Sequence, residues 1–295
     1  GSGGDHLAQL AIEEGKLPVV SLHDMMLPEW VDENWLVVAT SHSGVTQETI
    51  DATRQAIERN LSIIAITTGG ALEAMLDGVA HHQIIPIDGG RPARTCFGEI
   101  LAAMVTVGRH TGVLGENPTT NEARRAWLSQ EVDKHDLVKN GRNDVASLAR
   151  TIAGAPIAAL ASTSLAPTAY RFRCQVNENA GTFVRDATLP EAHHNEIVAW
   201  GEDNVEIPQQ AVLFFEQAEQ STVMQRRLDW TIEHGIRSPC MWRLLLEGAT
   251  LYDRYLHGAI ISDWLSFAIA LLRGKDPSAI DPILELKAYL NSEIP

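Results

Sequence analysis

Hydroxyl side chains are concentrated in residues 40–49 (TSHSGVTQET), between an apolar run and a helical pattern. Gly44 permits a tight turn, and the helix that follows would offer unpaired backbone N–H groups and the positive end of its dipole. Hydroxyls and amides together could hold a phosphate group without any lysine. Ser43 or Thr46 could equally cap the helix after an ordinary polar turn, and spacing alone does not separate the two interpretations. The segment has no Walker A pattern (GxxxxGK).

Carboxylates and imidazoles come close together in sequence at residues 177–179 (NEN) and 189–196 (LPEAHHNE). The first segment is at a predicted helix end and the second is in a loop, and both contain groups that general acid–base catalysis uses. Metal binding by His193, His194 and Glu196 is a weaker alternative, because no HExxH or other recognised ligand spacing is present. A solvated polar loop is the simplest interpretation from composition alone.

The hydroxyl-rich segment belongs to a region in which short apolar runs alternate with helical patterns. Near-continuous apolar runs predict buried strands at residues 18–22, 36–40, 62–67 and 83–87. Helices are predicted between and after these runs, at residues 46–60, 71–79 and 97–113. The alternation is typical of a parallel sheet that helices cover on both faces. Ligands of such sheets bind beyond the carboxyl ends of the strands, which is where residues 40–49 lie.

The alternation stops at residues 116–145, which contain no convincing strand, and we expect a helical connector there. It resumes with strands predicted at residues 157–161, 211–215 and 241–246 and helices at residues 164–179, 221–236, 249–272 and 278–290. Residues 37–44 and 158–164 both pass from an apolar strand into a hydroxyl-rich loop, which indicates a duplicated α/β unit. The expected fold is therefore α/β, with two three-layer lobes at residues 1–115 and 146–295.

The composition is that of an ordinary globular protein, with 45% hydrophobic and 21% charged residues among 295. The 23 basic and 38 acidic side chains give a net charge of −15, so the chain lacks the positive surface that nucleic acids and anionic membranes require. Three scattered cysteines indicate neither a disulfide framework nor a zinc knuckle. No run reaches the roughly 18 consecutive apolar residues of a membrane span. We expect a cytoplasmic protein with no nucleic-acid or membrane partner.

Several motifs, taken in order, resemble one family. Residues 41–49 resemble the phosphate loop of the sugar isomerase (SIS) domain. Residues 177–180 (NENA), followed by residues 194–198 (HNEIV), are similar to the bifunctional phosphoglucose/phosphomannose isomerase family. Motifs near the end of the chain match the same family at residues 262–267 (SDWLSF), 274–277 (GKDP) and 286–287 (LK). The resemblance stays in register from Asp5 to Lys287, which is nearly the whole chain.

The resemblance implies two SIS lobes per subunit and a homodimer with active sites between the subunits. It also implies interconversion of fructose 6-phosphate with glucose 6-phosphate, and with mannose 6-phosphate, with no metal and no cofactor. By matching positions, it assigns binding of the sugar phosphate to Ser41, Ser43, Gly44 and Thr46. The family has a further Gly-Gly-Ser turn whose serine binds phosphate. In this register that turn falls just before Gly1, so it is missing unless Ser2 substitutes for it.

Catalytic roles carry over from the resemblance to four side chains. Glu178 would move the proton between C1 and C2, and His194, from the partner subunit, would open the sugar ring. Lys287 would assist at the sugar hydroxyl and the ring oxygen, and Arg94 would stabilise the enediolate. A non-catalytic SIS sensor of phosphosugars, and an isomerase of a different phosphosugar, are the alternatives. The acid–base groups favour an enzyme, because a sensor would have no need of them.

Overall fold

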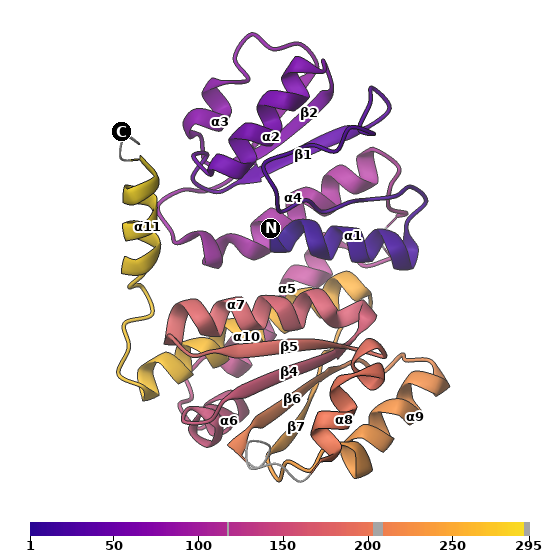
Figure 1. The fold of residues 1–295 in the computed structure, drawn as a ribbon, viewed down its shortest axis with the longest axis vertical. Helices are drawn as coiled ribbons and strands as arrows, with labels where there is room; N and C mark the ends of the chain where they lie inside the picture. Colours follow the sequence, from indigo (N-terminus) through magenta and orange to yellow (C-terminus); the bar gives the residue numbers. More distant parts are fainter. Residues whose placement is uncertain (117, 203–208, 292–295) are drawn as a thin grey trace. The chain divides into compact units, whose positions relative to one another are not determined.

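Residues 1–116 and residues 117–295 form two separate units of the computed structural model, which describes residues 1–116, 118–202 and 209–291 (Figure 1). Each unit is built on one sheet whose strands are all parallel. The α/β fold with parallel sheets is therefore confirmed.

The sheet of the first unit has the strand order β1-β2-β3. Its strands are β1 (Leu36–Ser41), β2 (Ser62–Thr67) and β3 (His82–Pro86). The parallel register places Ser41 opposite Thr67 at the carboxyl edge of the sheet. The central strand β2 buries Ile63 and Ile66, as expected for a near-continuous apolar run that is covered on both faces.

Four α-helices accompany this sheet. They are α1 (Ser2–Glu14), α2 (Gln47–Glu58), α3 (Gly70–Ala74) and α4 (Phe97–His110). Helix α2 packs against β1, β2 and α3, whereas α4 packs against α1. The helices predicted over residues 46–60 and 97–113 are confirmed, with ends that differ by a few residues, and the one predicted over residues 71–79 is shorter.

The prediction of a strand at residues 18–22 is wrong, because these residues form no strand. Val20 is half exposed and Pro18 has no backbone N–H to donate to a ladder, so the apolar run is not part of a buried sheet. Conversely, the glycine-rich start of the chain gives little sign of α1. Packing of the buried Leu7 and Leu10 in α1, which lies against α4, outweighs this low helix propensity.

The sheet of the second unit has the order β5-β4-β6-β7. Its strands are β4 (Ile157–Ser162), β5 (Val184–Leu189), β6 (Ala211–Glu216) and β7 (Met241–Leu245). Every residue of the two central strands, β4 and β6, is buried. The edge strand β5 was not predicted, because Arg185 and Asp186 interrupt its apolar pattern. Both charges form ion pairs outside the sheet, an arrangement that an edge strand tolerates.

Helices cover both faces of this sheet (Figure 1). Phe215 of β6 packs against Phe172 on one face, with 5.5 Å between ring centroids. Its neighbour Phe214 packs on the other face with Trp200 and Leu228. The helices of this unit are α5 (Asn121–His135), α6 (Asp144–Ile152), α7 (Ala166–Ala180), α8 (Glu196–Gly201), α9 (Thr222–Trp230), α10 (Leu251–Leu272) and α11 (Asp281–Asn291), of which α11 does not cover the sheet. Phe172 belongs to α7, Trp200 to α8 and Leu228 to α9, so this is a three-layer arrangement.

The segment predicted as a connector, residues 116–145, contains α5 and the first residues of α6; its residue 117 lies outside the described residues. Helix α5 packs against α10, and α10 also packs against α6 and α7. Helix α10 is long and apolar enough to cross a membrane by length and composition, but 67% of the relevant window is buried within the protein. This burial is typical of a core helix, so α10 is weak evidence for a membrane span.

Candidate active site

The hydroxyl-rich loop connects β1 to α2 in the first unit. Ser41 is the last residue of β1 and is buried, and Thr46 is the N-cap residue of α2. The two hydroxyl oxygens lie 2.8 Å apart and share a hydrogen bond across the loop. Ser43 is exposed between them, and its Oγ accepts a 3.4 Å hydrogen bond from the N–H of Val45. The structure therefore gathers three predicted phosphate-binding hydroxyls before the first turn of a 12-residue helix.

Gly44 lets this loop approach the loop that follows β2. Its φ is +64°, and a Cβ atom there would lie 1.8 Å from the carbonyl oxygen of Gly69. The N–H of Leu72 donates to the Gly44 carbonyl at 2.8 Å, and the Thr68 hydroxyl donates to the His42 carbonyl at 2.7 Å. Only glycine fits at position 44, and the second loop holds the first in place. Sequence reasoning missed this support, although the pair Gly69-Gly70 marks a tight turn.

The loop has the features of an anion site. Backbone N–H groups in the first turn of a helix have no carbonyl partner within that helix and attract anions. Among the described residues, two buried polar atoms of this segment have no hydrogen-bond partner: Thr40 Oγ1 and His42 Nε2. His42 stands between two predicted site residues, yet we did not single it out from the sequence.

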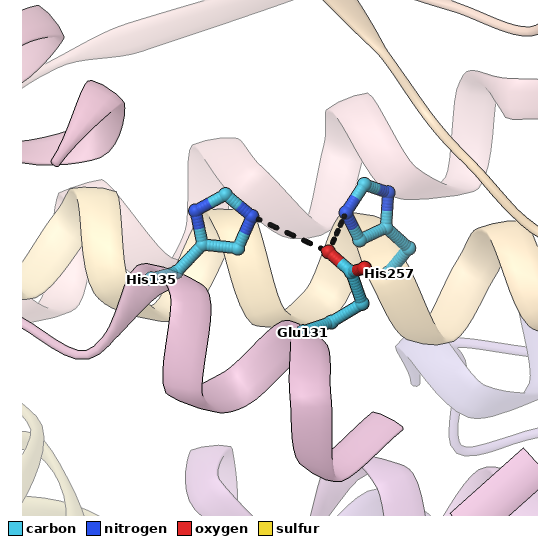
Figure 2. Close-up of side chains that lie close together, drawn as sticks. All are labelled: Glu131, His135 and His257. Atoms are coloured by element: carbon cyan, nitrogen blue, oxygen red, sulfur yellow. Dashed lines mark ion pairs between the residues drawn. The ribbon is translucent and has the colours of Figure 1, made fainter. Parts of the chain in front are cut away.

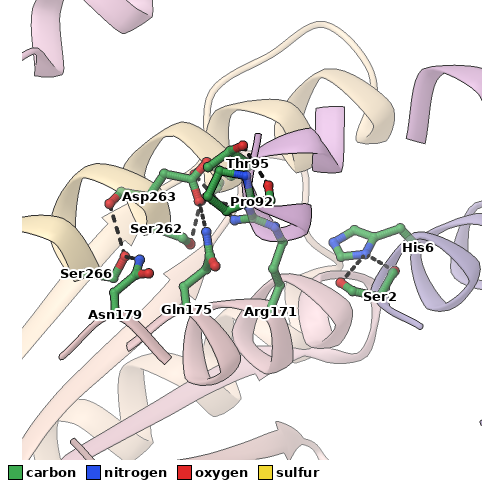
Figure 3. Close-up of polar contacts among 12 residues, drawn as sticks. Ser2, His6, Pro92, Thr95, Arg171, Gln175, Asn179, Ser262, Asp263 and Ser266 are labelled. Atoms are coloured by element: carbon green, nitrogen blue, oxygen red, sulfur yellow. Dashed lines mark hydrogen bonds and ion pairs between the residues drawn. The ribbon is translucent and has the colours of Figure 1, made fainter. Parts of the chain in front are cut away.

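Arg94 and Ser2 also belong to the first unit. Arg94 is half-buried in a 3₁₀ helix (Ala93–Cys96) that follows β3, and β3 ends at the edge of the sheet where the hydroxyl-rich loop begins. One strand separates β1 from β3, which corresponds to about 10 Å. Ser2 lies in the first turn of α1, where its Oγ is 3.5 Å from His6 Nδ1 (Figure 3). Among the described residues, the side chain that interacts with the Ser2 hydroxyl therefore belongs to the same helix.

Glu178 lies in the last turn of α7 and is partly exposed. The preceding residue, Asn177, accepts a 3.1 Å hydrogen bond from the N–H of Val184, the first residue of β5. This contact places the end of α7 at the amino edge of the second sheet. Burial raises the pKa of the nearby Cys174 thiol, and the negative charge of Glu178 contributes to that rise.

His194 lies beyond the opposite end of β5, in a 3₁₀ helix (Glu191–His194), and its side chain is exposed. Its neighbour His193 is bound inside the unit, by Thr231 Oγ1 at 2.7 Å from Nε2 and by Arg227 at 3.3 Å from Nδ1. Burial lowers the pKa of His193, and the charges of Arg227 and His194 lower it further. Of the two adjacent histidines, His194 is the one that presents its ring to the surface.

Glu178 and His194 are close in sequence but lie at opposite edges of the sheet. Glu178 lies near the start of β5 and His194 follows its end, and a six-residue strand is about 17 Å long. A single subunit therefore does not bring these two side chains together. Lys287 is exposed on α11, whose residues 281–290 are all exposed. The metal set His193, His194 and Glu196 is not among the possible ligand groups found in the described part of the chain.

One buried group with suitable metal ligands lies in the described residues outside the predicted site (Figure 2). Glu131 and His135 of α5 and His257 of α10 place their ligand atoms within 4.8 Å of one another. The carboxylate oxygen of Glu131 lies 3.3 Å from His257 Nε2 and 3.8 Å from His135 Nε2. All three side chains are buried, so the distances alone would suit a metal ion.

The hydrogen bonding of His257 argues against that interpretation. The backbone N–H of Glu247 donates to His257 Nδ1 at 2.9 Å, so in the neutral ring the hydrogen is on Nε2 and faces the Glu131 carboxylate. A metal ion on Nε2 would require the hydrogen on Nδ1, where it would oppose the Glu247 N–H. Burial lowers the pKa of both His135 and His257. The group is a close polar contact between α5 and α10, in which the Glu131 carboxylate faces the rings of His135 and His257.

Comparisons with known proteins agree with this architecture. A protein described as the C-terminal domain of glucosamine-fructose-6-phosphate aminotransferase from Francisella tularensis superposes with a TM-score of 0.73 at 11% identity, over 94% of this chain and 82% of that one. At this identity the likeness shows the fold alone. A bifunctional phosphoglucose/phosphomannose isomerase from Thermoplasma acidophilum is 28% identical over 99% of this chain and 88% of its own length. A D-glucosamine-6-phosphate 4-epimerase from Sulfolobus acidocaldarius is 30% identical over 57% of this chain and 51% of its own.

The second unit, with its parallel sheet, contains the residues that match a model of a SIS domain, so this part of the chain belongs to the SIS class. Residues 142–290 match the family model described as the bacterial phospho-glucose isomerase C-terminal SIS domain, and the chain belongs to that family.

Proposed function

We propose that the protein is an aldose–ketose isomerase that interconverts fructose 6-phosphate with glucose 6-phosphate and mannose 6-phosphate. The observation that carries this proposal is the similarity over 99% of the chain to a protein named for these two activities. The partly exposed carboxylate of Glu178, in the last turn of α7, supplies the base that such a reaction needs. The proposed mechanism passes through an enediol and uses side chains only.

The chemistry assigns distinct roles to the site residues. One base must remove a proton next to the carbonyl carbon and return it to the neighbouring carbon, and the carboxylate of Glu178 suits this shuttle. The guanidinium group of Arg94 would stabilise the negative charge of the enediolate. Lys287 would act at the sugar hydroxyl and the ring oxygen. Glucose and mannose phosphates share one enediol because they differ only at C2, so rotation about C2–C3 would admit both.

The sugar phosphate would bind at the loop between β1 and α2. The hydroxyls of Ser41, Ser43 and Thr46 and the N–H groups of the first turn of α2 supply hydrogen-bond donors there. These neutral donors explain how a chain of net charge −15 can hold an anion. Gly44 is needed because the close approach of Gly69 leaves no space for a side chain.

Ring opening would require a second subunit. Glu178 and His194 lie at opposite edges of one sheet, so a site containing both needs His194 from another copy of the chain. The exposure of His194, next to the internally bound His193, supports this arrangement. A homodimer with shared sites is therefore part of the proposal.

Purified protein mixed with fructose 6-phosphate tests the reaction, with glucose 6-phosphate and mannose 6-phosphate measured separately. We expect both products. Tight binding of the sugar phosphate without product would instead support a sensor. The similarity to a 4-epimerase favours a second candidate, an enzyme for a different phosphosugar. That candidate would be supported if a hexosamine 6-phosphate were converted and fructose 6-phosphate were not.

Mixed dimers test the shared site. Glu178→Gln and His194→Ala proteins, each inactive, are mixed after reversible dissociation. In a twofold-symmetric dimer with shared sites, each heterodimer contains one intact site, so random mixing should restore about one quarter of wild-type activity. No recovery would show that the two residues act within one subunit or not together.

A further inference from the structure

A row of polar side chains connects α7 to α10 (Figure 3). Arg171 Nη2 donates to Asp263 Oδ1 at 2.7 Å, and Gln175 Nε2 donates to the same oxygen. One turn further along α7, Asn179 Nδ2 donates to Ser266 Oγ at 2.9 Å. The three α7 residues follow one another at intervals of four, so they lie along one side of the helix.

This row is buried on the α7 side and reaches solvent at Asp263. Arg171 and Gln175 are each 4% exposed, whereas the Asp263 side chain is 44% exposed. A buried guanidinium group is strongly destabilised without a carboxylate partner. Asp263 therefore has to remain in place for Arg171, and the same oxygen is then fixed as the acceptor for Gln175.

Glu178 lies among these contacts along α7. It is three residues after Gln175 and immediately before Asn179, and residues three apart on a helix have Cβ atoms about 5–6 Å apart. Helix α7 ends two residues later at Ala180, and Gly181 adopts a left-handed conformation. The final turn of a helix lacks part of its hydrogen bonding and frays unless other contacts hold it. The contacts with α10 stabilise the turn that carries the proposed base.

We propose that Gln175, through its hydrogen bond to Asp263, is a positioning residue for Glu178. This inference rests on the proposed isomerase function. A base that moves a proton between neighbouring carbons must be held accurately, and a displacement of about 1 Å can lower a rate about 10²-fold. Substrate affinity, in contrast, would come mainly from the phosphate loop of the first unit, so the contact should affect kcat more than KM.

Gln175→Met tests the proposal. Methionine has a similar length and helix propensity and removes only the amide group, while the Arg171–Asp263 ion pair remains. We expect kcat to fall about 10-fold or more, with KM for fructose 6-phosphate changed by less than about twofold. The matched control is Asp186→Asn, which breaks the 2.7 Å ion pair with Arg173 that also holds α7. The control should keep kcat within about twofold of wild type.

Hydrogen exchange provides a readout that does not depend on activity. Amides of residues 175–180 should exchange faster in Gln175→Met than in wild type or Asp186→Asn, with the rest of the second unit unchanged. If the wild type has no isomerase activity, the proposed function fails, while this measurement still tests the positioning contact. Unchanged kcat in Gln175→Met overturns the proposal. A fall in kcat with an equal rise in KM, or with general loss of folded protein, overturns it too.

Discussion

Gly44→Ala is the substitution for which the structure gives the clearest expected magnitude. Gly44 has a φ of +64°, and an added Cβ would lie 1.8 Å from the Gly69 carbonyl oxygen. Backbone atoms cannot move aside as a flexible side chain can, so the two loops must separate. Gly78 offers a matched control in the same unit, because its φ is +74° and a Cβ there would meet nothing within 4 Å.

The two substitutions share one cost and differ in another. A left-handed conformation costs an alanine about 1–2 kcal/mol, which applies to both positions. Separation of the loops at Gly44 also weakens the 2.8 Å bond from the Leu72 N–H to the Gly44 carbonyl and the 2.7 Å bond from the Thr68 hydroxyl to the His42 carbonyl. At about 1 kcal/mol for each net hydrogen bond, Gly44→Ala should destabilise the protein by about 2 kcal/mol more than Gly78→Ala.

Urea denaturation measures the stability difference, and calorimetric titration with fructose 6-phosphate measures binding. We expect the affinity of Gly44→Ala to fall at least about 10-fold, because the displaced loop no longer presents its hydroxyls and amides together. The affinity of Gly78→Ala should remain that of the wild type. Equal stability of the two variants, with equal affinity, would refute the argument that the close approach of the two loops shapes the phosphate site.

Two further predictions concern the second unit. Burial lowers the pKa of His135 and His257, so the unfolded chain binds protons at a higher pH than the folded one. The two buried histidines should therefore not reduce the free energy of unfolding above about pH 6.5, where both states are neutral. Below about pH 6.5 the unfolded chain binds protons more readily, so the free energy of unfolding should fall. Urea midpoints at pH 7.5 and 5.5 check this, and His135→Gln should reduce the difference; an unaltered difference would contradict it. Asp253→Ala removes the partner of the buried Arg124 and should cost about 3–5 kcal/mol in urea denaturation. A loss below about 1 kcal/mol would show that water reaches this pair.

The strands that could be predicted are those whose own apolar sequence shows that they are buried. Strands β4 and β6 are buried along their whole length, so an uninterrupted apolar run identifies them. The edge strand β5 could not be recognised, because its Arg185 and Asp186 find partners outside the sheet. Helix α1 was missed because its packing against α4 depends on residues about 100 positions away.

The same distinction applies to the site. The hydroxyl-rich loop is local, so the sequence predicts that Ser41 and Thr46 come together. Its support by Gly69 depends on a second strand of the sheet and could not be predicted. Glu178 and His194 are separated by only 16 positions, yet the length of β5 places them at opposite edges of the sheet. Their proximity in sequence therefore indicates nothing about contact within one subunit.

The central claim is that Glu178 moves the proton between C1 and C2 of the sugar phosphate. The most direct test is kcat of Glu178→Gln with fructose 6-phosphate, measured beside calorimetric binding of the same compound. Glutamine keeps the shape of the side chain but is not a base, so kcat should fall at least about 10²-fold while binding remains. Turnover by Glu178→Gln at a rate close to that of the wild type would contradict the account.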